Sequence, residues 1–252
     1  MVDPNTVRAI VDGARLQPTD HVLEIGPGLG SLTLGLASAV ARVTAVELDA
    51  GFVTVLADVL EGIGNVEVVH ADALAVDVAT LAGPGSVRVV ANLPYNIATP
   101  LLFHLLASDT VADLYVMVQR EVGERWQADV GDPLYAGVSL KLALQAEVAV
   151  ERTVPRSVFH PVPNVDSVMV RVTRHATAPS PADYRRQAAL IDAAFAQRRK
   201  TLRNTLRVVV PLDRLVVAAA SAGVDLGARA ETLDVAAIQR LDAALSSEPD
   251  AS

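Results

Sequence analysis

Short apolar runs alternate with longer amphipathic stretches through the first half of the chain. The short runs are predicted strands, and they lie at His21–Ile25, Arg42–Glu47, Asn65–Val69, Ser86–Ala91 and Leu114–Val118. The longer stretches are predicted helices, and they lie at Pro4–Ala14, Ser31–Val40, Ala50–Leu60 and Thr99–Leu106. Strands that alternate with such helices indicate βαβ units and a parallel sheet. Because these crossovers are right-handed, we predict an α/β fold with a doubly wound sheet.

The pattern changes after Gln119. Leu134–Val148 is ambiguous between helix and strand, whereas Val165–Arg174 alternates partly at period two and is predicted to be a late, antiparallel strand. Thr177–Pro181 is rich in proline and serine and is the predicted linker. The chain beyond it is predicted to be helical, at Asp183–Ala196, Leu202–Val209, Asp213–Ala222 and Val235–Leu245. We therefore predict two domains, an α/β domain over residues 1–175 and a small all-helical domain over residues 182–252.

The composition is that of an ordinary globular protein. The chain has 252 residues, of which 51% are hydrophobic, and it contains no cysteine. A chain of this length buries about 70% of its unfolded surface and needs no cross-links. Without cysteine, disulfide scaffolds, thiolate metal sites and cysteine nucleophiles are excluded. Neither a membrane-spanning apolar run nor a signal peptide is visible, so we expect a cytoplasmic protein.

The charge is distributed unevenly. The net charge of −8 taken alone argues against a nucleic-acid partner. Residues 176–211, however, carry seven basic and two acidic side chains, a net +5, against −9 for residues 1–175 and −4 for residues 212–252. A basic block of this kind favours contact with RNA phosphates over a merely solvated helix face. Its candidate RNA contacts are Arg198, Arg199, Lys200, Arg203 and Arg207. We predict that they form one broad helical face beside Phe195.

A glycine-rich turn follows the first predicted strand. Gly26, Gly28 and Gly30 lie between this strand and the next helix, where glycine lets the chain turn sharply and lets a ligand approach the backbone. Their spacing differs from the dinucleotide motif, and no Walker-type lysine follows, which argues against a nucleoside triphosphate. The turn by itself leaves ligand binding and a simple strand-to-helix connection equally open.

Two carboxylates extend this pattern to the neighbouring strand ends. Glu47 ends the second predicted strand, and Asp72 follows the third. Each alone is explained as a helix cap or a solvated loop residue. Together with the glycines they favour a nucleoside site, because ligands of doubly wound sheets bind at the carboxyl ends of the strands. S-adenosylmethionine fits such a site, since it carries adenosine without a phosphate.

The segment Asn92–Tyr95 ends the fourth predicted strand. In most proteins an Asn-Leu-Pro-Tyr sequence is an ordinary turn. Its functional interpretation is that the Asn92 side-chain oxygen and the Leu93 carbonyl accept hydrogen bonds from an aromatic amine. These bonds make the nitrogen lone pair available for attack. Tyr95 would then stack on a base that has left its helix.

These segments, in their order and spacing, resemble the ribosomal RNA adenine N6-dimethyltransferases. The similar segments are Glu24–Gly30, Val46–Asp49, His70–Leu74, Asn92–Asn96, Met117–Val122, Val158–Ser167 and Phe195–Asn204. The last two are typical of the branch that dimethylates two adjacent adenosines near the 3′ end of small-subunit ribosomal RNA. The resemblance covers almost the whole chain and implies a Rossmann-like sheet of the class I methyltransferase type.

The resemblance also implies roles for individual residues. S-adenosylmethionine is expected to contact Gly26, Gly28, Glu47, Asp72, Ala73 and Asn92. The target adenine is expected to contact Asn92, Leu93, Pro94, Tyr95 and Phe159. Phe159 corresponds to the second stacking aromatic of the family, with a loop-to-core anchor as its alternative role. A sulfonium methyl is already electrophilic, so no metal is expected, and positioning supplies the catalysis.

The expected substrate is small-subunit ribosomal RNA in an immature subunit, bound by a monomer. One alternative is an adenine methyltransferase of large-subunit RNA or of DNA, although Leu93 differs from the Asp/Asn-Pro-Pro-Tyr of DNA enzymes. A second alternative is an assembly factor that binds subunits without methylating them. The family has a basic segment and a Leu-Gly-Gln-Asn-Phe stretch before the position of Met1, so we expect weaker cofactor binding with the fold retained.

Overall fold

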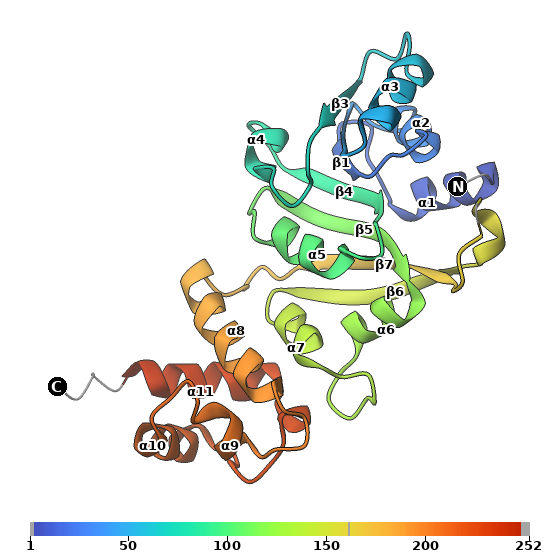
Figure 1. Ribbon diagram of the computed structural model, residues 1–252. Helices are drawn as coiled ribbons and strands as arrows, with labels where there is room; N and C mark the ends of the chain where they lie inside the picture. The colour runs from blue at the N-terminus through green and yellow to red at the C-terminus, as the bar shows by residue number, and fades with distance from the viewer. Residues whose placement is uncertain (1–2, 161, 248–252) are drawn as a thin grey trace. The chain divides into compact units, whose positions relative to one another are not determined.

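The computed structural model describes residues 3–160 and 162–247 and is built on a seven-stranded sheet. The strands are β1 (His21–Ile25), β2 (Arg42–Glu47), β3 (Val66–His70), β4 (Val87–Asn92), β5 (Val111–Gln119), β6 (Ala146–Val154) and β7 (Ser167–Arg174). Their order is β3-β2-β1-β4-β5-β7-β6 (Figure 1). The first five in this order pair in parallel, and β7 is antiparallel to β5. The predicted α/β class and the predicted antiparallel late strand are confirmed.

Helices connect and follow these strands. They are α1 (Pro4–Gly13), α2 (Ser31–Ala37), α3 (Ala50–Val59), α4 (Val78–Ala82), α5 (Ala98–Leu106), α6 (Arg120–Gln127), α7 (Gly137–Ala143), α8 (Pro181–Phe195), α9 (Leu202–Leu206), α10 (Leu212–Ala222) and α11 (Val235–Ser247), with 3-10 turns η1 (Arg156–Val158) and η2 (Ala230–Thr232). Asp3 and Asp49 cap α1 and α3 by accepting from backbone N–H groups of the first turn. Among the described residues, no helix is long and apolar enough to cross a membrane.

Some elements lie where the sequence pattern is weak. The ambiguous stretch Leu134–Val148 contains α7 and the start of β6. The helix α6 is short and mostly polar, and its apolar side chains are only Val122 and the buried Trp126, so no helix was predicted there. The strand β6 is at the edge of the sheet and exposes charged residues, which interrupts its alternation. The periodic pattern is therefore weakest for short or edge elements with few apolar residues.

The chain forms two compact units. The first contains residues 1–123 and 148–174, and the second contains residues 124–147 and 175–252. Residues 177–180 of the predicted linker lie between β7 and α8 without helix or strand, and its last residue, Pro181, begins α8. Residues 124–147 belong to the second unit by their contacts, although the sequence-based division assigns them to the first domain.

The sheet of the first unit is covered on both faces. Val22 and Met117 on the strands pack with Ile10 of α1 and Leu36 of α2 in one buried cluster. Side chains alternate along a strand, so the buried neighbours of these residues point to the opposite face, where α5 contacts β5. Burial on both faces explains why the parallel strands appear in the sequence as nearly continuous apolar runs.

Arg88 of β4 connects the end of α1 to the amino-terminal edge of the sheet through hydrogen bonds and an ion pair. Its guanidinium donates two hydrogen bonds of 2.7 Å to Asp113 of β5 and forms an ion pair of 3.1 Å with Asp20. It also donates to the carbonyls of Ala14 and Arg15, which follow α1. The hydrogen bonds to Asp113 raise the pKa of Arg88 above its ordinary value. This edge is therefore held by charge-assisted hydrogen bonds.

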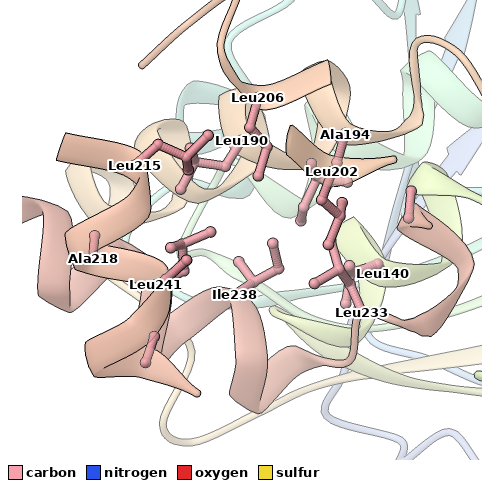
Figure 2. Packing of buried hydrophobic residues seen from close by; sticks show 14 of the residues in the cluster. Leu140, Leu190, Ala194, Leu202, Leu206, Leu215, Ala218, Leu233, Ile238 and Leu241 are labelled. Carbon is pink, nitrogen blue, oxygen red and sulfur yellow. The ribbon is translucent and has the colours of Figure 1, made fainter. Parts of the chain in front are cut away.

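The second unit has an apolar core of its own (Figure 2). Leu190 of α8, Leu215 of α10 and Ile238 of α11 are buried together in it. The hydroxyl of Tyr135 donates to the carbonyl of Leu233 over 2.6 Å, so the segment before α7 is tied to the chain before α11. The predicted helical character of residues 183–245 is confirmed, with turns between the helices.

A carboxyl group is buried in β1. Glu24 is 1% exposed, and one of its oxygens has no hydrogen-bond partner. Burial raises the pKa of Glu24 to about 8, against the opposing effect of the Thr33 hydroxyl. In the unfolded chain the same group ionises near pH 4.5. Its contribution to stability is therefore complete below the unfolded pKa and is lost as the pH rises through the folded pKa.

We expect Glu24→Gln to remove this pH dependence. Relative to the parent, the free energy of unfolding of the variant should rise by about 1 kcal/mol per pH unit from about pH 5 to about pH 8. Chemical denaturation at several pH values measures the difference. Glu61→Gln, which alters an exposed carboxylate, is the matched control. Parallel stability profiles for parent and Glu24→Gln would contradict the prediction.

Candidate active site

The carboxyl ends of the parallel strands bring the predicted site residues to one edge of the sheet. Ile25 of β1 pairs with Val46 of β2, and Asn92 of β4 pairs with Met117 of β5. The glycine turn, Glu47 and the Asn92–Tyr95 turn therefore leave the sheet beside one another. The register of the sheet places these segments together although they are far apart in the sequence.

Glu47 holds the glycine turn in place. One carboxylate oxygen accepts from the N–H of Gly28 at 3.1 Å, and the other accepts from the N–H of Asp49 at 3.0 Å. The side chain is only 7% exposed. Gly26 has a φ of +68°, and a Cβ atom there would lie 3.7 Å from Pro94. This left-handed backbone conformation, rather than the ordinary contact with Pro94, explains why glycine is favoured at position 26.

A cavity of about 380 Å³ opens between these turns. It is bounded by the glycine turn, the end of β2, α3, the Asn92–Tyr95 turn and the loop before β7. Its lining residues are Gly26, Gly28, Glu47, Phe52, Asn92, Leu93, Pro94, Tyr95, Phe159 and Pro163.

A second cavity of about 280 Å³ adjoins the first. It shares Gly26, Glu47 and Pro94 with the first cavity and adds Asp72 and Ala73. Apolar side chains form most of its remaining wall: Ile25, Val46, Leu48, Leu74 and Ile97. All residues that the sequence assigns to cofactor or target adenine line one of these two cavities.

Asn92 has an unusual environment in the wall of the larger cavity. Its side-chain Oδ1 atom is buried and accepts no hydrogen bond. The next residue, Leu93, is fixed because its N–H donates to the Met117 carbonyl at 3.0 Å. A buried amide oxygen without a donor costs free energy, which a ligand N–H would recover.

The two predicted aromatic residues lie in the same cavity but differ in burial. Tyr95 is half-buried, and its hydroxyl lies 2.8 Å from the Ser167 hydroxyl. Phe159 is 9% exposed and packs against the cluster that contains Ile10 and Leu36. Phe159 is therefore an anchor of its loop to the core as well as part of the cavity wall.

The basic residues lie in the second unit, and not on one helix. The helix α8 ends at Phe195, and Arg198, Arg199 and Lys200 occupy the turn that follows it. Arg203 is in α9, and Arg207 follows its last residue. The expectation of one continuous helical face is wrong, because Leu202 and Leu206 enter the core of this unit and require a new helix direction. All five basic side chains are exposed.

Three residues near the site were missed by the sequence analysis. Phe52 and Pro163 line the larger cavity, and Ser167 contacts Tyr95. Phe52 is one of only four phenylalanines in the chain and follows Asp49 by three positions, which was an available signal. The chain itself gives no sign that Ser167 meets Tyr95, because they lie 72 positions apart.

Comparison with known sequences identifies close relatives. Residues 1–245 match the family described as ribosomal RNA adenine dimethylase. A ribosomal RNA small subunit methyltransferase A from Leifsonia xyli subsp. xyli is 46% identical and aligns with 96% of this chain and 89% of its own length. The protein of the same name from Thermobifida fusca is 44% identical, covering 96% of this chain and 86% of the relative.

Solved structures agree with this assignment. A dimethyladenosine transferase from Plasmodium falciparum matches with a TM-score of 0.79 and 26% identity over 96% of this chain and 95% of that one. The 23S rRNA methyltransferase ErmE matches with a TM-score of 0.74 and 28% identity over 97% and 98% of the two chains. Both confirm the class I methyltransferase type of α/β fold. The chain belongs to the ribosomal RNA adenine dimethylase family.

Proposed function

We propose that this protein transfers methyl groups from S-adenosylmethionine to N6 of two adjacent adenosines in a hairpin near the 3′ end of small-subunit ribosomal RNA. It acts as a monomer in the cytoplasm on the immature small subunit and contributes to subunit biogenesis. The observation that carries the proposal is the buried, unpartnered Oδ1 atom of Asn92 in the wall of the larger cavity.

The residues around the smaller cavity fit the adenosine part of S-adenosylmethionine. Its apolar walls suit a flat adenine ring, and Asp72 uses one carboxylate oxygen for the N–H of Leu74, leaving the other for the adenine amine. Each oxygen of Glu47 accepts one hydrogen bond from the protein and has a second lone pair for a ribose hydroxyl. The bound cofactor supplies an electrophilic methyl group on its sulfonium.

Asn92 prepares the target nitrogen for attack. Its Oδ1 atom accepts an N–H of the adenine amine, which favours a pyramidal nitrogen with an available lone pair. Tyr95 and Phe159 form walls against which the base stacks after it leaves its helix, a step that costs a few kcal/mol. No general base is needed at the amine, because the proton leaves to solvent after the nitrogen has been alkylated. Catalysis therefore comes from positioning.

The basic residues of the second unit supply the RNA contacts. Within the part of the chain that the structure describes, Arg199, Lys200, Arg203 and Arg207 are exposed and form no ion pair with the protein. Free basic side chains can neutralise phosphates, and this neutralisation supplies much of the affinity for nucleic acid. The helical domain is accordingly the RNA-binding part of this proposal.

The small-subunit target is favoured over the large-subunit alternative by sequence similarity. The relatives named as small-subunit enzymes are up to 46% identical, whereas the structural neighbour named as a 23S enzyme is 28% identical. The larger similarity supports the small-subunit substrate.

Mass spectrometry of small-subunit RNA tests the proposed reaction. Small subunits that lack the modification are incubated with the protein and S-adenosylmethionine, and we expect dimethyladenosine at two adjacent positions. Reactions without cofactor are the control. Binding without methylation would instead identify an assembly factor, and methylation confined to large-subunit RNA would favour the alternative enzyme.

We expect Asn92→Ala to fold normally and to lose activity. Removing one preorganised hydrogen-bonding group from a reaction centre lowers kcat by about 100-fold or more. Single-turnover methylation measures the loss, and thermal melting checks the fold. Asn5→Ala, which alters an exposed asparagine of α1, is the control and should retain parental turnover. Parental turnover in Asn92→Ala would refute the role of its amide oxygen.

We expect Arg199→Glu combined with Arg203→Glu to weaken RNA binding and its dependence on salt. Each lost phosphate contact lowers the slope of log affinity against log salt by about 0.7–0.9, so the double variant should lose about 1.5. Fluorescence anisotropy at several salt concentrations measures both effects. Arg8→Glu with Arg152→Glu makes the same change in net charge at exposed positions of the first unit. Equal losses in the two double variants would place the RNA surface elsewhere.

A further inference from the structure

Ser167, on the antiparallel strand, contacts one wall of the proposed adenine pocket from behind. It is the first residue of β7 and pairs with Gln119, the last residue of β5. The carboxyl end of β5 and the amino end of β7 therefore share the edge where the Asn92–Tyr95 turn leaves β4. Ser167 is fully buried, and its hydroxyl lies 2.8 Å from that of Tyr95.

This hydrogen bond restrains a side chain that otherwise has few restraints. Tyr95 is in a turn between β4 and α5, outside any helix or strand, and its side chain is half-buried in the cavity wall. The phenolic oxygen is the side-chain atom farthest from the backbone. A bond at this atom restricts rotation about the first side-chain torsion and so fixes where the ring lies, whereas it leaves rotation of the ring about its own long axis free, because the oxygen lies on that axis.

The preceding residue, Asp166, fastens the loop that carries the other aromatic wall. Its carbonyl accepts from the N–H of Arg120 at 3.0 Å, and its Oδ1 atom accepts from the N–H of Arg156 at 3.1 Å. Its Oδ2 atom lies 3.5 Å from the Arg120 guanidinium. The Arg156 carbonyl in turn accepts from the N–H of Phe159. Asp166 thus connects the end of β5 to the turn that holds Phe159.

We propose that Asp166 and Ser167 are positioning residues that together set the separation of the two aromatic walls, Tyr95 and Phe159. Ser167 fixes the Tyr95 ring through its hydroxyl, and Asp166 fixes the loop of Phe159 through its carboxylate. This inference rests on the proposed function, in which the target base stacks in this cavity. Neither residue contacts the base itself, so both act on the reaction through the walls they hold.

A double-mutant cycle tests the hydroxyl pair. Ser167→Ala and Tyr95→Phe each remove one hydroxyl and keep the rest of the side chain, including the stacking ring. Each should lower kcat by about tenfold, the equivalent of one hydrogen bond, with a smaller change in KM for RNA. Because both variants break the same bond, the double variant should resemble either single variant. The role of Ser167 would be overturned if the double variant lost the product of the two single losses in kcat, or if neither single variant lost activity.

Ser108→Ala is the matched control for this cycle. The Ser108 hydroxyl also bonds another hydroxyl, that of Thr110, over 2.7 Å. It lies just before β5, at the sheet edge away from the proposed site. We expect parental turnover in this variant. A tenfold loss there as well would show that any broken hydroxyl pair slows the enzyme through general loosening.

A fluorescent base reports on the pocket independently of turnover. A hairpin RNA with 2-aminopurine at the target position is titrated with each variant, since stacking on an aromatic ring quenches this base. Ser167→Ala and Tyr95→Phe should give brighter complexes than the parent at saturation. Equal brightness would overturn the proposal. A parent that neither methylates RNA nor changes this fluorescence would instead refute the proposed function.

The second half of the proposal is tested at Asp166. Asp166→Asn keeps the Oδ1 acceptor for the Arg156 N–H, whereas Asp166→Ala removes it. We expect Asp166→Ala to lower kcat by about tenfold and to brighten the 2-aminopurine complex, with a clearly smaller effect of Asp166→Asn. Equal losses in the two variants would show that the charge of Asp166, rather than its bond to the loop, matters.

Discussion

The parallel pairing of β1 with β2 and β4 is the constraint on which the candidate site depends. Parallel strands deliver their carboxyl ends to the same edge, so the turn after β1, Glu47 at the end of β2 and Asn92 at the end of β4 become neighbours. The carboxylate of Glu47 then fixes the glycine turn by accepting from the Gly28 N–H. The same register that forms the core thus assembles the two cavities.

The two edges of the sheet are stabilised in different ways. At the amino-terminal edge, Arg88 satisfies carboxylates and carbonyls at once, and this network holds the end of α1. At the other edge, the carboxyl end of β5 meets the amino end of β7, and single hydrogen bonds such as that between Tyr95 and Ser167 hold the cavity walls. Asn92 Oδ1, a buried polar atom without a partner, lies on the ligand-binding side.

Much of the fold could be predicted because the strands are buried on both faces. The ranges of β1 and β2 agree with the prediction, and helices form at the predicted places after Asp3 and Asp49, which cap them. The predictions were poorest where an element is short with few apolar residues, as in α6, or lies at an exposed edge, as in β6. The basic side chains were predicted to share one helical face, but they do not, because the chain turns after Phe195 and the leucines of α9 enter the second core. Tertiary packing decided that direction.

The sequence by itself determined how most of the strands and helices follow one another along the chain. It also determined the glycine and carboxylate residues at the strand ends and the family to which the chain belongs. These features are local, because periodicity, capping and motif spacing are properties of short segments. Only the tertiary structure decided that Ser167 meets Tyr95 and that the Asn92 amide oxygen is buried without a donor. Both follow from pairing between distant strands, and the burial of an atom depends on every element packed around it.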